Sequence, residues 1–128
     1  MSDKQAPGGE DLPPPVYTSL EEWLHDKLVP MYRRRGARWC PQWFLHEEAI
    51  ERLQAVWEKW EDAVVSGEWH EWWLYVCDPQ MAVLTSADGP FVSCSEKGGH
   101  VELTPFPLAD PNPLRWRGSK FADPVPAR

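Results

Sequence analysis

Long hydrophobic runs are missing from this chain of 128 residues. None approaches the roughly 20 apolar residues that a membrane-spanning helix needs, and no apolar core of a secretory signal follows the polar start at Met1–Gln5. Cysteine is also scarce, with three residues, an odd number, and no disulfide-type spacing. Such usage is typical of a reduced compartment. The sequence therefore predicts a cytoplasmic protein without a membrane partner.

Positive charge is in short supply as well. Lysine and arginine together number 13 against 20 acidic residues, so the formal net charge is −7. A general nucleic-acid coat needs a basic face that displaces counterions, and this balance argues against one. No Gly-x-Ser-x-Gly elbow or phosphate-cradling glycine loop occurs, and Leu74 replaces the second histidine that the zinc-protease motif beginning at His70-Glu71 requires. We therefore expect no enzymatic activity.

Tryptophan, by contrast, is abundant, with nine residues, most of them at helical spacing. Each indole brings a large apolar area and one N–H group that needs a partner when buried. We predict a mainly α fold, a small tryptophan-rich domain of three to four helices. Its predicted core is centred on Trp23, Trp57, Trp60, Trp72 and Trp73.

Proline and glycine define the ends of the predicted domain. Residues 1–15 contain Pro13-Pro14-Pro15 and are predicted to be a disordered lead. From Pro105 onward, repeated prolines forbid regular hydrogen-bond ladders. The folded part is therefore predicted to be 16–104, followed by a proline-rich tail at 105–128.

The helices have clear start and stop signals. Thr18 or Ser19 caps a first helix that Pro30 stops or kinks, and a broad apolar stripe predicts a second helix from His46 to Val65, with Gly67 as terminator. A third helix is predicted over 68–76, and a fourth, short one begins at Asp78-Pro79. The alternative for the last region is a short hairpin near 81–94.

Two features are candidate partner-binding sites. The first is the dense basic cluster of Arg33, Arg34, Arg35 and Arg38. This cluster either binds an external partner, phosphate or an acidic protein surface, or forms internal ion pairs with acids of the second helix. Those acids are Glu47, Glu48 and Glu51. The second is Trp116, between two arginines of the tail. It is either a docking motif or a clip onto the domain.

One set of residues has metal-ligand chemistry. Cys40 and His46 are separated by five residues, and so are Cys94 and His100. Together they offer the two thiolates and two imidazoles of a tetrahedral zinc site. The spacing differs from that of usual zinc motifs, and buried cysteines often serve packing alone. We expect no cofactor, with a zinc site on these four residues as the alternative.

A series of short motifs along residues 16–100 carries a family resemblance. They are Val16-Tyr17, Ser19-Leu20-Glu21-Glu22-Trp23, Tyr32-Arg33-Arg34, Trp39-Cys40-Pro41, Trp43, His46, Trp72-Trp73, Asp78-Pro79, Asp88-Gly89-Pro90-Phe91 and Cys94. In this order they resemble the actinobacterial family called domain of unknown function 4913. The resemblance implies a small accessory protein of plasmids, integrative elements or phages, and no assigned biochemical activity.

Three functions follow as hypotheses. The first is a non-enzymatic adaptor that serves the DNA-processing or transfer machinery of a mobile element, with another protein as its partner. The second is a DNA-binding protein that uses the cluster Arg33–Arg38 on phosphate. The third is a small zinc-binding unit built on the four cysteine and histidine residues.

Overall fold

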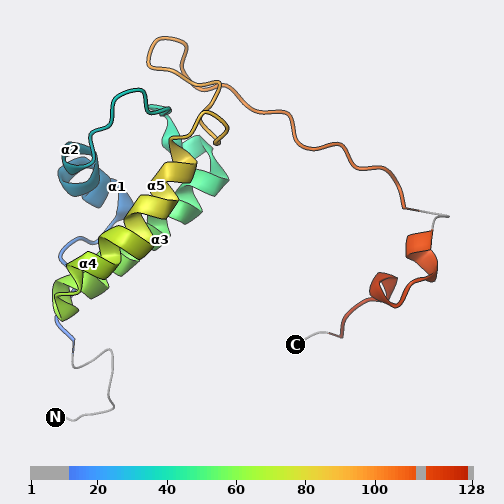
Figure 1. Cartoon of the computed structure of the whole chain (residues 1–128), viewed down its shortest axis with the longest axis horizontal. Coiled ribbons are helices and arrows are strands. Elements are labelled where there is room, and N and C mark those ends of the chain that lie inside the picture. Colours follow the sequence, from blue (N-terminus) through green and yellow to red (C-terminus); the bar gives the residue numbers. More distant parts are fainter. Residues whose placement is uncertain (1–11, 112–114, 127–128) are drawn as a thin grey trace.

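The computed structural model describes residues 12–111 and 115–126, so most of the predicted disordered lead lies outside the described residues. Three continuous helices form the domain, as the sequence predicted (Figure 1). The second and longest, α3, spans Glu47–Ser66. The first comprises α1 (Leu20–Trp23), the π-helical turn η2 (Leu24–Leu28) and α2 (Val29–Met31). The third comprises α4 (Trp69–Glu71), the π-helical turn η4 (Trp72–Cys77) and α5 (Asp78–Leu84).

The predicted helix ends match the observed caps. The Ser19 hydroxyl accepts a hydrogen bond from the Glu22 amide at 3.2 Å, as an N-cap residue does. Helix α3 begins directly after His46 and ends at Gly67, whose φ of 77° is the left-handed conformation that glycine adopts without strain. The chain before α1 is tied to α3, since the amides of Val16 and Tyr17 both donate to the Glu61 carboxylate.

Both prolines inside helices follow a π-helical turn. The amide of Val29, just before Pro30, donates to the carbonyl of Leu24, five residues back, and Asp78, just before Pro79, donates in the same way to Trp73. A wider turn relieves the contact between a proline ring and the preceding carbonyls, which otherwise breaks an α-helix. The predicted break between a third and a fourth helix is therefore wrong, whereas the first helix ends at Met31, directly after Pro30.

The hairpin alternative near 81–94 is also not found. Met81–Leu84 completes α5, and residues 86–93 form turns. Within the described ranges, the only β-bridge is an isolated antiparallel one that pairs Ser95 with Gly99. The apolar run that suggested a strand is instead one face of a helix, because Met81 and Leu84 both point into the core.

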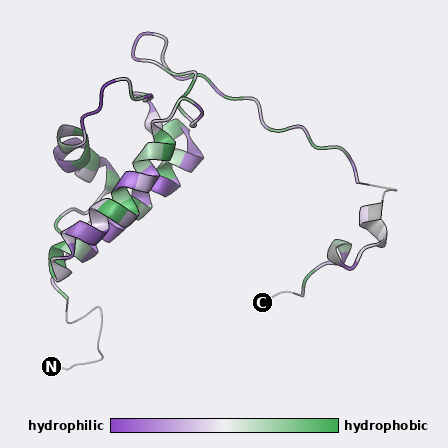
Figure 2. Cartoon of the chain, in the orientation of Figure 1, coloured by the Kyte–Doolittle hydropathy of each residue, from purple (hydrophilic) through white to green (hydrophobic). Residues whose placement is uncertain are grey.

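The hydrophobic core lies between the three helices and holds three of the five predicted tryptophans. Trp23, Trp60 and Trp72 are buried, and the Trp72 indole donates to the Val56 carbonyl at 3.0 Å. Trp57 and Trp73 are only half-buried and pack against the edge of the core, so the prediction placed them too deep. Polar and apolar residues alternate along the ribbon of α3, consistent with one face packed inward (Figure 2).

Two irregular segments complete the domain, and a third leaves it. Residues 32–46, which include the 3-10 turn η3 (Trp43–Leu45), join the first helix to α3, and residues 85–100 follow α5. Residues 101–111, here called the arm, run away from the domain toward two further turns, η5 (Arg115–Gly118) and η6 (Lys120–Ala122) (Figure 1). Trp116 lies in η5 and its side chain is exposed.

No helix in the described part of the chain has the length and apolar character needed to cross a membrane.

Candidate metal centre

The structure brings Cys40, His46, Cys94 and His100 together. One ligand atom from each lies within 4.8 Å of the others. The pairing is crossed: Cys40 Sγ lies 3.7 Å from His100 Nδ1, whereas Cys94 Sγ lies 3.5 Å from His46 Nε2. Each cysteine therefore meets the histidine of the other Cys-x5-His segment, and the two segments form one cluster.

The two sulfur–nitrogen distances match those between ligands of a tetrahedral metal site. Zn–S bonds of ~2.3 Å and Zn–N bonds of ~2.0–2.1 Å separate neighbouring ligand atoms by roughly 3.4–3.8 Å. The two sulfur–nitrogen separations above fall in that range, and His100 Nδ1 lies slightly closer to His46 Nε2, at 2.9 Å. Two sulfurs and two imidazole nitrogens in this arrangement are the donor set that zinc prefers. The residues present therefore fit a zinc ion.

The first pair of ligands is held by the segment before α3. The Arg38 amide donates to the Thr85 carbonyl at 3.0 Å, which fastens the segment to the end of α5 two residues before Cys40. His46 occupies the N-cap position of α3, where its extended backbone directs the ring away from the helix. That ring packs edge-on against Phe91, with ring centroids 4.9 Å apart. The cap of a long helix thus fixes one imidazole.

A tight loop holds the second pair. Ser95 and Gly99 exchange two backbone hydrogen bonds of 3.2 and 2.8 Å, which reverse the chain between Cys94 and His100. Gly99 has φ of 74°, a conformation that other residues rarely adopt, so the reversal requires glycine. The Val101 amide then donates to Cys94 Sγ at 3.3 Å. A backbone donor of this kind stabilises a thiolate, the form of cysteine that binds metal.

Glu102 is a fifth residue of the site. Its Oε2 atom lies 2.6 Å from His100 Nε2. A carboxylate here holds the proton on Nε2, so the lone pair of Nδ1 faces the sulfur atoms and the other imidazole. No sequence motif indicated this residue as part of the site. A carboxylate two positions after a ligand histidine was the only signal available.

The ionisation of the cluster follows from its burial. Burial raises the pKa of the Cys40 thiol, and a hydrogen bond from the Gln42 backbone partly offsets this rise. Burial lowers the pKa of His46, and the nearby His100 lowers it further. The hydrogen bond to His100 lowers the pKa of Glu102. A neutral imidazole is the form that binds metal, and a buried thiol gives up its proton when a cation compensates the charge.

The predicted arginine cluster is exposed on the segment after α2. The Arg33 side chain donates to the Pro30 carbonyl at 2.8 Å, and the Arg34 guanidinium lies 3.8 Å from the centre of the Tyr32 ring. None of the four arginines forms an ion pair with a carboxylate of the described residues. Glu48, a proposed internal partner, instead pairs with Arg52 at 3.0 Å.

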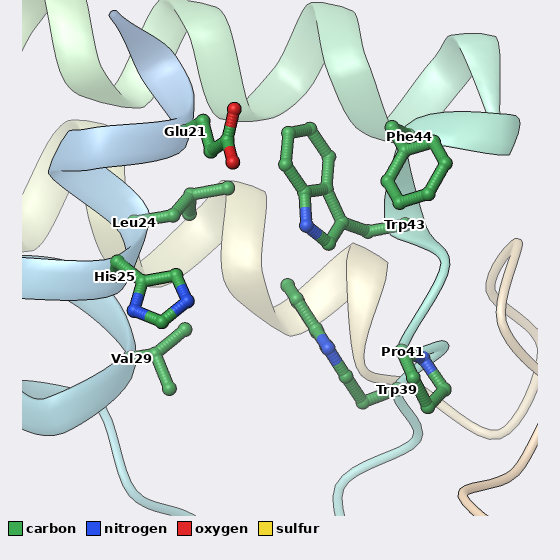
Figure 3. A pocket seen from close by; sticks show the side chains of 8 residues that line it. All are labelled: Glu21, Leu24, His25, Val29, Trp39, Pro41, Trp43 and Phe44. Carbon is green, nitrogen blue, oxygen red and sulfur yellow. The ribbon is translucent and has the colours of Figure 1, made fainter.

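An aromatic groove lies between the first helix and the segment before α3. It has a volume of about 610 Å³, and Figure 3 shows Trp39 and Trp43 on one side facing Leu24, His25 and Val29 on the other. A second hollow of about 320 Å³ shares Val29 and Trp39 with it. That hollow is lined by Arg33 and Arg34. Val29 and Trp39 therefore line both hollows, one beside the aromatic residues and one beside the arginine cluster.

Comparison with known proteins gives a family and no characterised relative. No curated protein and no solved structure matches the chain. The model of one family, described as a domain of unknown function (DUF4913), matches residues 17–113. The match begins at the residue that ties the chain to α3, includes the four clustered ligand residues, and extends through the arm. The chain belongs to the DUF4913 family.

Proposed function

We propose that this protein is a non-enzymatic interaction module whose fold is held together by a structural zinc ion. The observation that carries the proposal is the placement of two sulfurs and two imidazole nitrogens within 4.8 Å of one another. The donors come from segments 48 to 60 positions apart in the chain. A bound ion would cross-link the segment before α3 to the loop after α5.

The number of protein ligands supports a structural role for the ion. Catalytic zinc sites use three protein ligands and leave a fourth position for water or substrate, whereas structural sites are closed by four. Here Cys40, His46, Cys94 and His100 supply all four positions. The zinc ion would then stabilise the fold, and function would belong to the surface that the ion holds in place.

That surface contains the aromatic groove and the arginine cluster. The arginines and the aromatic wall of the groove lie on the segment that carries Cys40, so the same cross-link would fix their positions. The four arginines have no carboxylate partner within the described residues, which leaves their charge available to an acidic partner. We infer that the partner is another protein, and that the module acts in the cytoplasm as an adaptor for the DNA-processing or transfer machinery of an actinobacterial mobile element.

Direct DNA binding through Arg33, Arg34, Arg35 and Arg38 is the second candidate function. The exposure of the cluster favours it. The net charge of −7 opposes it. Helix α3 also opposes it, because it carries six acidic residues and only two basic ones, and the acids would repel phosphate. Titration with duplex DNA at several salt concentrations separates the two functions, because phosphate binding weakens steeply with salt.

Metal content tests the zinc centre directly. The full chain, purified without chelator, is expected to contain one zinc ion per molecule by elemental mass spectrometry. Cys94→Ser should lose the ion, whereas Cys77→Ser should retain it, because Cys77 lies in the core and outside the cluster. A wild-type protein that contains no zinc, and binds none when zinc is added, would overturn the proposal.

A further inference from the structure

Two of the three cysteines lie close enough to react with each other. The sulfur atoms of Cys40 and Cys94 lie within 4.8 Å of each other in the cluster described above. Both residues lie outside the helices, so rotation of the two side chains breaks no helical hydrogen bond. A disulfide brings two sulfurs to ~2.05 Å, so a short movement of these side chains would join them. Cys77 is buried in η4 and does not belong to the cluster.

A surface hollow leads to Cys94 and not to Cys40. It has a volume of about 520 Å³ and lies between the segment before α3 and the loop after α5. Cys94 and Ser95 line it from the loop, and Arg38 and Trp39 line it from the opposite segment. Cys94 is 6% exposed, whereas Cys40 is fully buried. A small polar oxidant that enters the hollow therefore meets Cys94 first.

The backbone next to Cys94 favours the reactive form of its thiol. The thiolate is the nucleophilic form of cysteine, and a hydrogen bond donated to the sulfur stabilises it. The Val101 amide donates to Cys94 Sγ at 3.3 Å. Arg38 and Glu96 line the hollow with opposite charges, so the amide is the donor that is specific to Cys94. The loop therefore places an activated sulfur on the wall of an open hollow.

We propose that Cys94 is a site of reversible oxidation by hydrogen peroxide, and that Cys40 completes the reaction by forming a disulfide with it. The inference rests on the zinc centre proposed above and adds a regulation of that centre. Zinc and the disulfide exclude each other, because both use the same two sulfur atoms. Oxidation would therefore prevent rebinding of the ion and leave His46 and His100 without it. In a reducing compartment, disulfides of this kind are typically transient and redox-sensing.

The oxidation has two balanced steps, which take place in chains from which the ion has dissociated. The Cys94 sulfur attacks one oxygen of hydrogen peroxide, the O–O bond breaks, and the thiol becomes a sulfenic acid while water leaves. The Cys40 sulfur then attacks the Cys94 sulfur, the S–O bond breaks, and a second water leaves as the disulfide forms. Hydrogen peroxide takes up the two electrons that the two thiols lose, and both thiol protons end in water. A small dithiol reverses the reaction by thiol–disulfide exchange.

Treatment of the full, zinc-loaded chain with hydrogen peroxide tests the proposal. A chromogenic chelator measures the released zinc, and mass spectrometry of alkylated peptides locates the disulfide. We expect one zinc ion released for each disulfide between Cys40 and Cys94, with Cys77 still reduced. Excess zinc should slow the oxidation, because the bound ion occupies both sulfurs. A dithiol followed by zinc should restore the original metal content.

Variants identify the cysteine that the oxidant attacks. In Cys40→Ser the sulfenic acid cannot be resolved, so dimedone should trap it on Cys94. In Cys94→Ser dimedone should trap nothing on Cys40, and Cys77→Ser is the matched control that should form the disulfide like wild type.

The peptide map of the wild-type chain decides the outcome even where a variant fails to fold. A zinc-loaded chain that forms no disulfide between Cys40 and Cys94 under peroxide, or that oxidises Cys77 first, overturns the oxidation site and leaves the zinc centre standing. A chain that binds no zinc but forms this disulfide overturns the zinc centre and leaves the reaction of the two cysteines standing.

Discussion

The Nδ1 atom of His100 lies 2.9 Å from the Nε2 atom of His46, although 54 positions separate the two residues in the chain. Both nitrogens also face cysteine sulfur, and His100 is turned toward this meeting point by Glu102 on its other nitrogen. Two imidazole nitrogens this close are stabilised either by a shared proton or by a cation between them. The sulfur atoms around them favour the cation.

Removal of zinc should loosen one part of the molecule and leave another folded. Treatment with a chelator should lower the melting temperature, because the proposed zinc ion would cross-link residues 40–46 to residues 94–100. The helices keep their own buried core, so hydrogen exchange should accelerate at 91–101 while the amides of 49–63 stay protected. Global unfolding on chelation would show that the core cannot stand alone. Unchanged exchange would contradict the cross-link.

Glu102 should tune the affinity for zinc. Glu102→Ala removes the acceptor that orients His100 and should weaken zinc binding about 10–100-fold. Glu102→Gln retains a carbonyl acceptor, so its zinc affinity should fall less than that of Glu102→Ala. Glu96→Ala, an exposed carboxylate in the neighbouring loop, is the control and should leave the affinity unchanged. Competition with a chromogenic chelator measures all three, and equal affinities for alanine and wild type would show that Glu102 does not position the ligand.

The three cysteines should differ in reactivity. Burial raises the pKa of Cys77 to about 12, so its thiol stays protonated at neutral pH and should react slowly with alkylating reagents. Cys40 and Cys94 should be protected in the zinc-bound protein and become reactive after chelation. Mass spectrometry of alkylated peptides checks the order. Alkylation of Cys77 before the other two would contradict the burial seen here.

Tryptophan substitutions should separate the core from its edge. Trp60→Ala empties a buried position and should cost about 3–5 kcal/mol, enough to unfold much of a domain with ordinary stability. Trp73→Ala removes a half-buried ring and should cost less. Thermal melts followed by circular dichroism compare the two. A Trp73 variant as unstable as the Trp60 variant would mean that the edge of the core is essential.

Replacing Arg33, Arg34 and Arg35 with glutamine should abolish partner capture and leave the melting temperature close to that of wild type. The reason is that these side chains form no ion pair with a carboxylate of the described residues, so little stability depends on their charge. Affinity capture and thermal melting of the same variant give both readouts. A large fall in melting temperature would reveal a structural role, and unchanged capture would remove the cluster from the contact surface.

The helices and their clearest boundaries follow from local sequence signals. Ser19 and Gly67 act through their own side chain and backbone conformation, and the apolar stripe of α3 is local periodicity. The four possible ligands were also recognisable, because cysteine and histidine carry their chemistry wherever they lie. The local sequence predicted a helix break at Pro79, but the helix is continuous there. The π-helical turn before Pro79 depends on a backbone adjustment that no residue type indicates.

Only the tertiary structure decided which distant residues meet. Each cysteine pairs with the histidine of the other segment, Cys40 with His100 and Cys94 with His46. This crossed pairing arises because Arg38 binds the end of α5 and Phe91 packs on His46. Both contacts join segments about 45 positions apart or more in the chain. The role of Glu102 and the aromatic groove depend on the same contacts. Burial depth was likewise a tertiary outcome. Trp57 and Trp60 share the stripe of α3, but Trp60 packs against the rings of Tyr17, before α1, and of Trp23 in α1. Helix packing covers part of an apolar face and leaves the rest at its margin.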